Sequence, residues 1–376
     1  MEFELTGDHV EVRDLAATIF ADLASTERVV QVEKAEDSFD RRLWSTLADS
    51  GMLGIALPES AGGAGLGILG LVALLEQQGR RVAPVPLWSV VAGAALPIAQ
   101  FASPAQAERW LPGLLDGTGI LSGGFDAPPG RRASLTGRRS DRAITVDGEI
   151  AQVPAAGLAA AVVVPVELED GDLVLAVVPT DRPGVVVTPV APTSRENAAA
   201  VRFEDVVLTS DDVLPGDGAQ QVEWVHNRLR VALAAIQLGV CAEAVRLTAA
   251  YTSERVQFGR PLSTNQAVAL RAADAHIDTE AIRVTTYRAA WLLDEGQEEA
   301  AGSASLVAKW WASQGGLRVV HATQHLHGGI GADVDYPIHR YFLWGRQVAF
   351  SLGSAAAVAA ELGDRLEDAP AIGAPA

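Results

Sequence analysis

The residues best suited to bind an anion lie where two helical segments of the sequence meet. Arg255, Gln257 and Phe258 stand just before Gly259 and Pro261, a pair that ends one helix before the next begins. This corner therefore presents a cation, an amide and an aromatic ring close together. A guanidinium offers fixed donors that match phosphate oxygens, so the pattern indicates a site for an extended anionic molecule.

A second corner carries two histidines followed by glycines. His325 and His327 precede Gly328 and Gly329, and a further glycine stands at position 331. Backbone N–H groups there can approach a ligand with no side chain in the way. The alternative, a metal site built on the two histidines, lacks a third ligand, so we predict no metal.

Both corners belong to the last of three segments with different periodicity. The first segment has helical spacing, the second has short β-branched runs between Asp-Gly, Pro-Gly and Pro-Thr signals, and the third is helical again. The sequence predicts an α+β, mainly α fold. Its expected parts are an N-terminal helical domain (1–117), a central antiparallel β domain (118–217), a C-terminal four-helix bundle (218–367) and a flexible tail (368–376). The bundle helices are expected at about 222–254, 266–296, 301–327 and 346–367.

Composition and charge restrict the partners of the chain. The 376 residues are 49 % hydrophobic and 20 % charged, which is typical of globular proteins. A net charge of −18 argues against nucleic acid and anionic membranes. No run reaches the ~18 apolar residues of a membrane span, an acidic start replaces a leader, and the single Cys241 forms no internal disulfide. We therefore expect a cytoplasmic protein.

Gly65, Gly67 and Gly70 match the spacing of a dinucleotide-binding loop. Such a loop follows a strand in a parallel βαβ unit and has an acidic residue about 20 positions later. Here helical segments lie on both sides, and residues 85–90 contain no acid. We therefore predict a glycine-rich connection without a nucleotide.

Four stretches spread along the chain form a set: LWSTLADSGMLGIALPESAGGAG, VRFEDVVLTSDDVLP, RVQFGRPLSTNQ and HGGIGADVDYPIHRYF. Together they resemble the acyl-CoA dehydrogenase family, flavoproteins that form an α,β double bond in thioester substrates. The resemblance covers almost the whole chain. It implies FAD as the cofactor, lying across a subunit interface, with its ADP half held by the neighbouring subunit.

The resemblance also implies which residues of this chain hold the ADP half of FAD. Arg255 would bind phosphate oxygens, Phe258 would form an apolar wall, and His325 stands where the family usually has Gln. The full implied set is Arg255, Gln257, Phe258, Gln266, His325, Gly328 and Gly329. The alternatives are a surface pair of Arg255 with Tyr251 or an acid, and a helix-capping role for His325.

The chain departs from the family where the reaction takes place. The family's general base is a Glu near the end of the chain or, in a minority, just before the Arg that opens the first long C-terminal helix. The matching residues are Leu352 and Leu229, which cannot accept a proton, so we predict no catalytic residue here. The two β-domain motifs that face the flavin ring are also missing, and Pro154 stands in the expected aromatic region of the second.

This combination suggests a division of labour between two chains. We predict one subunit of a heteromeric acyl-CoA dehydrogenase, similar to the α2β2 enzymes of actinobacterial steroid side-chain breakdown. A paralogous partner would supply the catalytic Glu and bind the acyl-CoA. One alternative is a self-sufficient enzyme with a relocated base at Glu223, Glu243 or Asp126. Another is a flavin-free acyl-CoA-binding or scaffold homologue.

Overall fold

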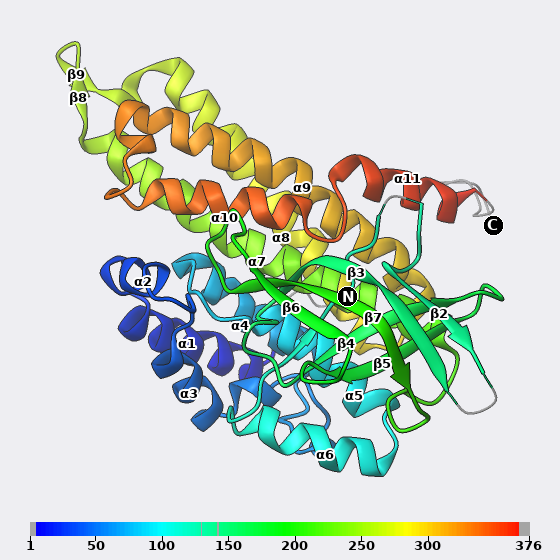
Figure 1. Cartoon of the computed structure of the whole chain (residues 1–376). Coiled ribbons are helices and arrows are strands. Elements are labelled where there is room, and N and C mark those ends of the chain that lie inside the picture. Colours follow the sequence, from blue (N-terminus) through cyan, green and yellow to red (C-terminus); the bar gives the residue numbers. More distant parts are fainter. Residues whose placement is uncertain (1–4, 129, 141–142, 368–376) are drawn as a thin grey trace.

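The computed structural model describes residues 5–128, 130–140 and 143–367. Helices come first along the chain, strands follow, and longer helices complete it (Figure 1). The predicted tail, 368–376, lies outside the described residues. The first helical segments are α1 (Gly7–Leu23), α2 (Thr26–Glu33), α3 (Arg41–Asp49), α4 (Gly67–Arg81), a π-helix (Trp88–Ala95), α5 (Leu96–Phe101) and α6 (Pro104–Leu115).

Seven strands form one sheet in the order β1-β4-β2-β3-β7-β6, with β5 paired to β4. The expected antiparallel pairing is found for β2–β3, β3–β7, β4–β5 and β6–β7. The sheet is nevertheless mixed, because β4 runs parallel to both β1 and β2. Residue alternation does not report strand direction, so the sequence could not show this. The strands are β1 (Leu121–Gly123), β2 (Leu135–Arg139), β3 (Ile144–Pro154), β4 (Ala161–Leu168), β5 (Leu173–Pro179), β6 (Val185–Val190) and β7 (Ala198–Leu208).

The C-terminal helices differ from the prediction in one place. The helix expected at 346–367 is two helices with a turn between them. Leu352 and Gly353 adopt left-handed backbone angles, with φ of 53° and 96°, and Ser354 caps the next helix by accepting the Ala357 N–H. The helices are α7 (Gly218–Glu254), α8 (Gln266–Asp294), α9 (Glu298–His327), α10 (Ile338–Phe350) and α11 (Ala355–Leu366).

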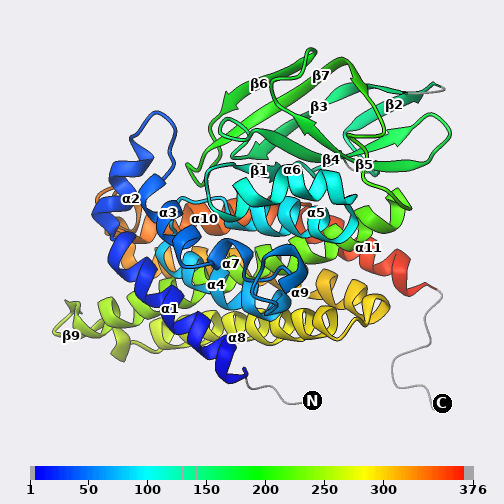
Figure 2. The ribbon, with the colours of Figure 1, turned by 90° about the horizontal axis from the view of Figure 1, so that it is seen from below.

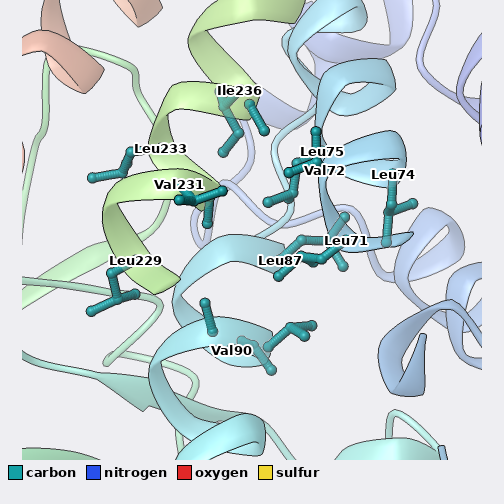
Figure 3. Close-up of a cluster of buried hydrophobic side chains, with 14 of the residues drawn as sticks. Leu71, Val72, Leu74, Leu75, Leu87, Val90, Leu229, Val231, Leu233 and Ile236 are labelled. Carbon is teal, nitrogen blue, oxygen red and sulfur yellow. The ribbon is translucent and has the colours of Figure 1, made fainter. Parts of the chain in front are cut away.

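The largest cluster of buried apolar side chains draws on most helices of the chain, and Figure 3 shows the part of it where leucine and valine side chains of α4, of the π-helix region and of α7 gather. Two glycines bring the helix backbones together. A Cβ on Gly79 would collide with the Ile236 carbonyl, and a Cβ on Gly239 would collide with the Glu76 carbonyl. The close approach joins the N-terminal helices to the bundle.

α7 is also the one helix among the described residues that is long and apolar enough to span a membrane. An 18-residue window of α7 has a mean hydropathy of 1.5, which the sequence expectation of no such run did not anticipate. However, 78 % of that window is buried inside the fold. Packing in the core of the bundle accounts for its apolar character.

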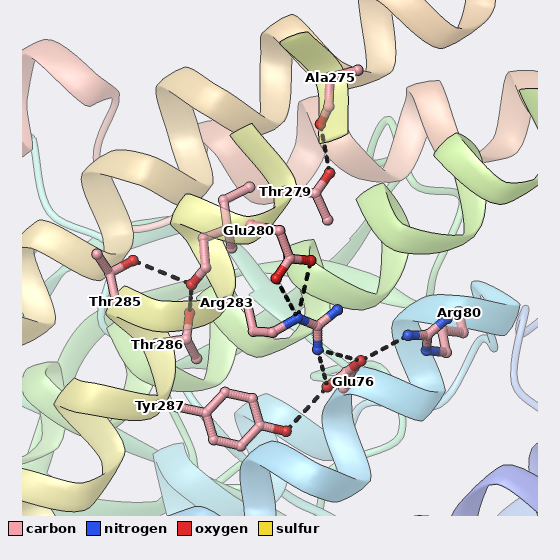
Figure 4. Close-up of polar contacts among 10 residues, drawn as sticks. Glu76, Arg80, Ala275, Thr279, Glu280, Arg283, Thr285, Thr286 and Tyr287 are labelled. Carbon is pink, nitrogen blue, oxygen red and sulfur yellow. Dashed lines mark hydrogen bonds and ion pairs between the residues drawn. The ribbon is translucent and has the colours of Figure 1, made fainter. Parts of the chain in front are cut away.

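The arrangement of layers leaves α8 on the outside. Seen from below, the β sheet covers one face of the molecule, and α8 runs along the edge furthest from the sheet (Figure 2). α8 is held to α4 by Glu76, a buried carboxylate that binds Arg283 and Tyr287 of α8 (Figure 4).

Candidate functional site

The predicted anion-binding corner is a short β hairpin between α7 and α8. Its strands are β8 (Val256–Gln257) and β9 (Arg260–Pro261), and the turn residues Phe258 and Gly259 have φ of 54° and 79°. These left-handed values are those of a tight two-residue hairpin turn. The hairpin projects beyond the end of the bundle (Figure 1).

The side chains of the hairpin point into solvent. Phe258 is 98 % exposed and Val256 is 53 % exposed, and Arg255, Gln257 and Gln266 are also exposed. The Arg255 backbone N–H donates to the Tyr251 carbonyl (2.8 Å), but the described residues include no salt-bridge partner for its guanidinium. The alternative of a surface ion pair for Arg255 therefore finds no support in this part of the chain. Exposed aromatic and aliphatic groups beside an available cation are typical of a binding surface.

The second predicted corner is the end of α9. Gly328 ends the helix with φ 65° and ψ −142°, a combination that only glycine adopts readily, and its N–H donates to the His325 carbonyl. A Cβ on Gly328 or Gly329 would meet nothing within 4 Å. The backbone there is open on its outer side, and the His325 side chain is exposed one turn earlier.

The structure brings the two corners together through an aromatic contact. The rings of Tyr251 and His327 stack with centroids 4.6 Å apart and an angle of 23° between their planes. Tyr251 lies one helical turn before Arg255, and His327 immediately precedes Gly328. The predicted ADP-half residues therefore lie at one end of the bundle.

The two residues predicted to stand at the family's general-base positions are apolar and lie at or against the main core. Leu229 is 1 % exposed and belongs to the main hydrophobic core. Leu352 lies half-buried in the turn between α10 and α11 and packs against the same core. Neither side chain can remove a proton from a substrate.

A partly buried carboxylate and a buried ammonium group hold the turn that contains Leu352. Asp126 accepts the Leu352 backbone N–H (2.8 Å). The ammonium group of Lys309 donates to Ser313 Oγ (2.6 Å), to the Gly353 carbonyl (3.1 Å) and to two carbonyls at the end of α10 (both 3.3 Å). Burial lowers the pKa of Lys309 to about 7 and raises the pKa of Asp126, although the Leu352 N–H and Lys309 oppose the second shift.

A small cavity lies between β3 and α10, beside the turn that contains Leu352. Pro154 and Gln152 line it from β3, Ser351 closes it beside the Leu352 turn, and its volume is about 20 Å³. That space suits roughly one water molecule, whereas pockets for drug-sized ligands measure about 300–1,000 Å³. Glu196 also lines the cavity, and burial raises its pKa to about 7.

The other two acids considered as relocated bases are engaged elsewhere. Glu223 forms an ion pair with Arg365 of α11 and its side chain is half exposed. Glu243 is 8 % exposed on α7 and pairs with the exposed guanidinium of Arg246 (2.6 Å). Of the three candidates, Asp126 is the one bonded to the Leu352 turn.

Two residues of this region were not singled out from the sequence. Lys309 interrupts the apolar run ASLVAKWWA and is one of two lysines in the chain, so its placement was a usable signal for a buried charge. Glu196 lies in an irregular loop, and no sequence pattern marks its contact with the cavity.

The glycine-rich loop holds an internal carboxylate. Asp294 of α8 accepts the N–H groups of Ile68 (2.6 Å) and Leu69 (2.8 Å) at the N-terminus of α4. Gly67 has φ 63°, and a Cβ there would collide with the Asp294 carboxylate. The chain's own side chain occupies the position that an anion would take at this helix start, in line with the predicted connection. Elsewhere in the described residues, no group of three or more His, Cys, Asp or Glu could hold a metal ion.

Helices, a mixed sheet and a bundle with a projecting hairpin define an acyl-CoA dehydrogenase fold. Residues 6–118 match the acyl-CoA dehydrogenase N-terminal domain, and residues 216–366 match its C-terminal domain. The chain belongs to the acyl-CoA dehydrogenase family. Membership supports an FAD-dependent oxidoreductase acting on a CH–CH bond.

Three relatives are similar over nearly their whole length. Acyl-CoA dehydrogenase FadE27 of Mycobacterium tuberculosis is 34 % identical over 99 % of this chain and 100 % of its own. The crystal structure of the ChsE4-ChsE5 complex from the same organism contains a chain that is 33 % identical, with a TM-score of 0.93. The match covers 99 % of this chain and 100 % of that chain. A chain of a variant of the Tcur3481-Tcur3483 steroid ACAD is 43 % identical, with a TM-score of 0.88. The match covers 96 % of this chain and 97 % of that chain.

The residues at the end of the bundle suit the diphosphate of FAD, whereas the cavity beside Pro154 does not suit its flavin ring. The open backbone at Gly328 and the exposed guanidinium of Arg255 provide donors suited to a diphosphate. The cavity beside Pro154, in contrast, is too small for the three fused rings of a flavin.

Proposed function

We propose that this chain is the non-catalytic subunit of a heteromeric FAD-dependent acyl-CoA dehydrogenase, and that it lends its hairpin to FAD bound in a paralogous subunit. One contrast carries the proposal: the hairpin with Arg255 is exposed and has no acidic partner among the described residues, while the cavity beside Leu352 measures about 20 Å³. The relatives described as a ChsE4-ChsE5 complex and as a Tcur3481-Tcur3483 steroid ACAD support a partnership of two different chains.

In this proposal the chain's residues bind and orient the ADP half of the cofactor. Arg255 donates to the diphosphate, with charged hydrogen bonds worth roughly 1.5–3 kcal/mol each. Phe258 covers the adenine side, and the backbone N–H groups of Gly328 and Gly329 complete the cradle. Gln257, Gln266 and His325 supply further polar contacts.

When bound, FAD accepts the hydride that leaves the β-carbon of an acyl thioester. Proton removal from the α-carbon then falls to the partner, because Leu229 and Leu352 cannot perform it. The acyl-CoA lies in the partner's site, and its class, by analogy with the steroid ACAD, is a steroid side-chain CoA thioester. We further propose an α2β2 assembly in the cytoplasm, with the three domains divided at residues 117 and 217.

A row of exposed apolar residues gives the partner a surface to cover. Leu270, Ile277 and Val284 of α8 are 59 %, 64 % and 57 % exposed. Their seven-residue spacing places them on one face of the helix, since seven residues make nearly two turns. The row begins near the hairpin at the start of α8, so one neighbouring subunit can cover both.

The decisive experiment is flavin stoichiometry in the chain alone and in a complex with its paralogue. We expect little flavin in the lone chain and one FAD per heterodimer in the complex. Arg255→Ala should lower FAD occupancy, whereas Arg109→Ala, an exposed arginine on α6, should not. A lone chain that retains FAD and oxidises acyl-CoA with an artificial acceptor would overturn the proposal.

A second candidate function is a self-sufficient dehydrogenase with Asp126 as the base. The observation that favours it is the position of this carboxylate, bonded to the turn where the family's Glu stands. Its bond to Leu352 and its proximity to Lys309 favour a structural role instead. Asp126→Asn separates the two, because turnover should fall about a hundredfold or more if Asp126 is the base and stay within about twofold if its role is structural.

A further inference from the structure

Three aromatic rings join the ends of α7, α9 and the segment before α10. Tyr251 stacks on His327 at 4.6 Å, and His327 also lies 5.4 Å from the ring of Tyr336. The Tyr251 and Tyr336 centroids are 6.4 Å apart. Each ring therefore contacts the other two, which makes a closed cluster at the base of both corners.

His327 holds the central place in this cluster in a fixed orientation. Its side chain is 3 % exposed, and Nδ1 donates to the Thr323 carbonyl (2.8 Å). Nε2 is buried and has no hydrogen-bond partner among the described residues. Burial lowers the pKa of His327, so the ring is neutral and Nδ1 carries the proton.

The cluster is the direct support of both corners. The Arg255 N–H donates to the carbonyl of Tyr251, the residue stacked on His327, and Gly328 follows His327 in the chain. The exposed hairpin residues pack little against the bundle. The Tyr251–His327 stack is therefore the contact that joins the base of the hairpin to the Gly328 turn.

We infer that His327 is a positioning residue that sets the spacing between the hairpin and the Gly328 turn, so that both grip one adenosine diphosphate group. This inference rests on the proposed function. The stacked ring, rather than a bond to the ligand, carries the effect, since Nε2 is enclosed by protein. Pre-setting two binding elements lowers the entropy lost when the ligand binds, and so tightens binding.

The test uses the complex with the paralogous subunit and three variants. His327→Leu removes the stack, His327→Phe keeps a ring against Tyr251, and His321→Leu removes an exposed histidine from the same helix as a control. Phe is a fair replacement because Nε2 makes no hydrogen bond, so only the Thr323 contact is lost. FAD dissociation constants and the thermal midpoint of the FAD-free complex are measured for each.

We expect His327→Leu to raise the FAD dissociation constant roughly two- to tenfold, the range of an aromatic pair, while His327→Phe and His321→Leu stay near the parent value. Equal effects of Leu and Phe, or no effect of either, would overturn the inference if Arg255→Ala still loses FAD. Unchanged FAD binding by Arg255→Ala would instead remove the proposed function. Tyr251→Leu removes the stack from its other side and should weaken FAD binding to the same extent. If His327→Leu does not assemble with the partner, the FAD dissociation constant of Tyr251→Leu tests the inference in its place.

Discussion

The Asp126 carboxylate accepts a 2.8 Å hydrogen bond from the backbone N–H of Leu352. This bond connects the loop after β1 to the turn between α10 and α11, and Lys309 binds the same turn through the Gly353 carbonyl. The turn that contains Leu352, one of the two positions that the family resemblance assigns to a general base, is thus held from two sides, by the partly buried Asp126 and the buried Lys309.

Asp126→Asn should leave turnover of the heteromeric complex within about twofold. The amide oxygen can still accept the Leu352 N–H, but Lys309 loses the nearby negative charge. We expect a loss of roughly 1–3 kcal/mol in unfolding free energy, less than the 3–5 kcal/mol of an uncompensated buried charge, because Lys309 can release its proton. Turnover with an artificial electron acceptor and thermal melting measure both effects. A fall in turnover of about a hundredfold or more would make Asp126 the base.

His226 should make the protein sensitive to mild acid. Burial lowers its pKa to about 3 in the folded chain, with help from Arg230, against about 6.5 when unfolded. Between pH 6.5 and 3 the unfolded chain therefore binds more protons at this residue. The stability that His226 contributes is complete above pH 6.5 and is lost as the pH falls, by up to about 1.4 kcal/mol per unit.

His226→Phe should remove that dependence, because the ring against Phe125 is kept and the titrating group is lost. The measurement is the thermal midpoint of parent and variant at pH 7.5 and 5, with His321→Phe as an exposed control. The parent should fall further than His226→Phe between the two values. Parallel curves would show that His226 does not control acid stability.

The sequence predicted the features that depend on local pattern. Helical spacing located α7, α8 and α9, and the Gly259 and Pro261 pair located the corner between α7 and α8, which the structure shows to be a hairpin. Leu352 was identified as an apolar residue at the base position, but its left-handed backbone, which divides the last helix, was not foreseen because Leu rarely adopts it. The spacing of apolar residues did not reveal the left-handed backbone at Leu352.

Contacts between distant segments could not be predicted in the same way. Asp294 reaches the start of α4 across 226 positions, and the parallel pairing of β4 depends on connections rather than on alternation. The small cavity arises from Pro154 and Glu196 on different segments meeting α10. Each of these contacts depends on how distant segments pack together, and composition and periodicity do not determine that packing.

Glu76→Gln should destabilise the fold strongly. This carboxylate is 3 % exposed and accepts from Arg80 (2.9 Å), Arg283 (3.2 Å) and the Tyr287 hydroxyl (3.1 Å). Removing its charge leaves two guanidinium groups with less compensation at the contact of α4 with α8, at a cost of about 3–5 kcal/mol.

Glu280→Gln is the matched control, since Glu280 also pairs with Arg283 but its side chain is 43 % exposed. A pair of that kind is worth about 0–1 kcal/mol. Denaturant unfolding of both variants measures the difference. Similar losses for the two would mean that burial does not set the strength of this network.

Ile277→Asp should separate the chain from its partner without unfolding it. Ile277 is 64 % exposed at the middle of the apolar row on α8, and α8 lies on the outer edge of the molecule (Figure 2). In the assembled enzyme the new carboxylate would be buried without a partner, at a cost of about 2–5 kcal/mol to association. Light scattering should detect smaller species, and FAD should be lost when the complex separates because Arg255 acts on a neighbour's cofactor.

Leu15→Asp is the matched control. Leu15 is 47 % exposed on α1, and its replacement should leave assembly and FAD binding unchanged. If the Ile277→Asp variant still assembles and still binds FAD, the partner covers another face of the chain, and the hairpin must reach the partner's FAD without a contact through α8.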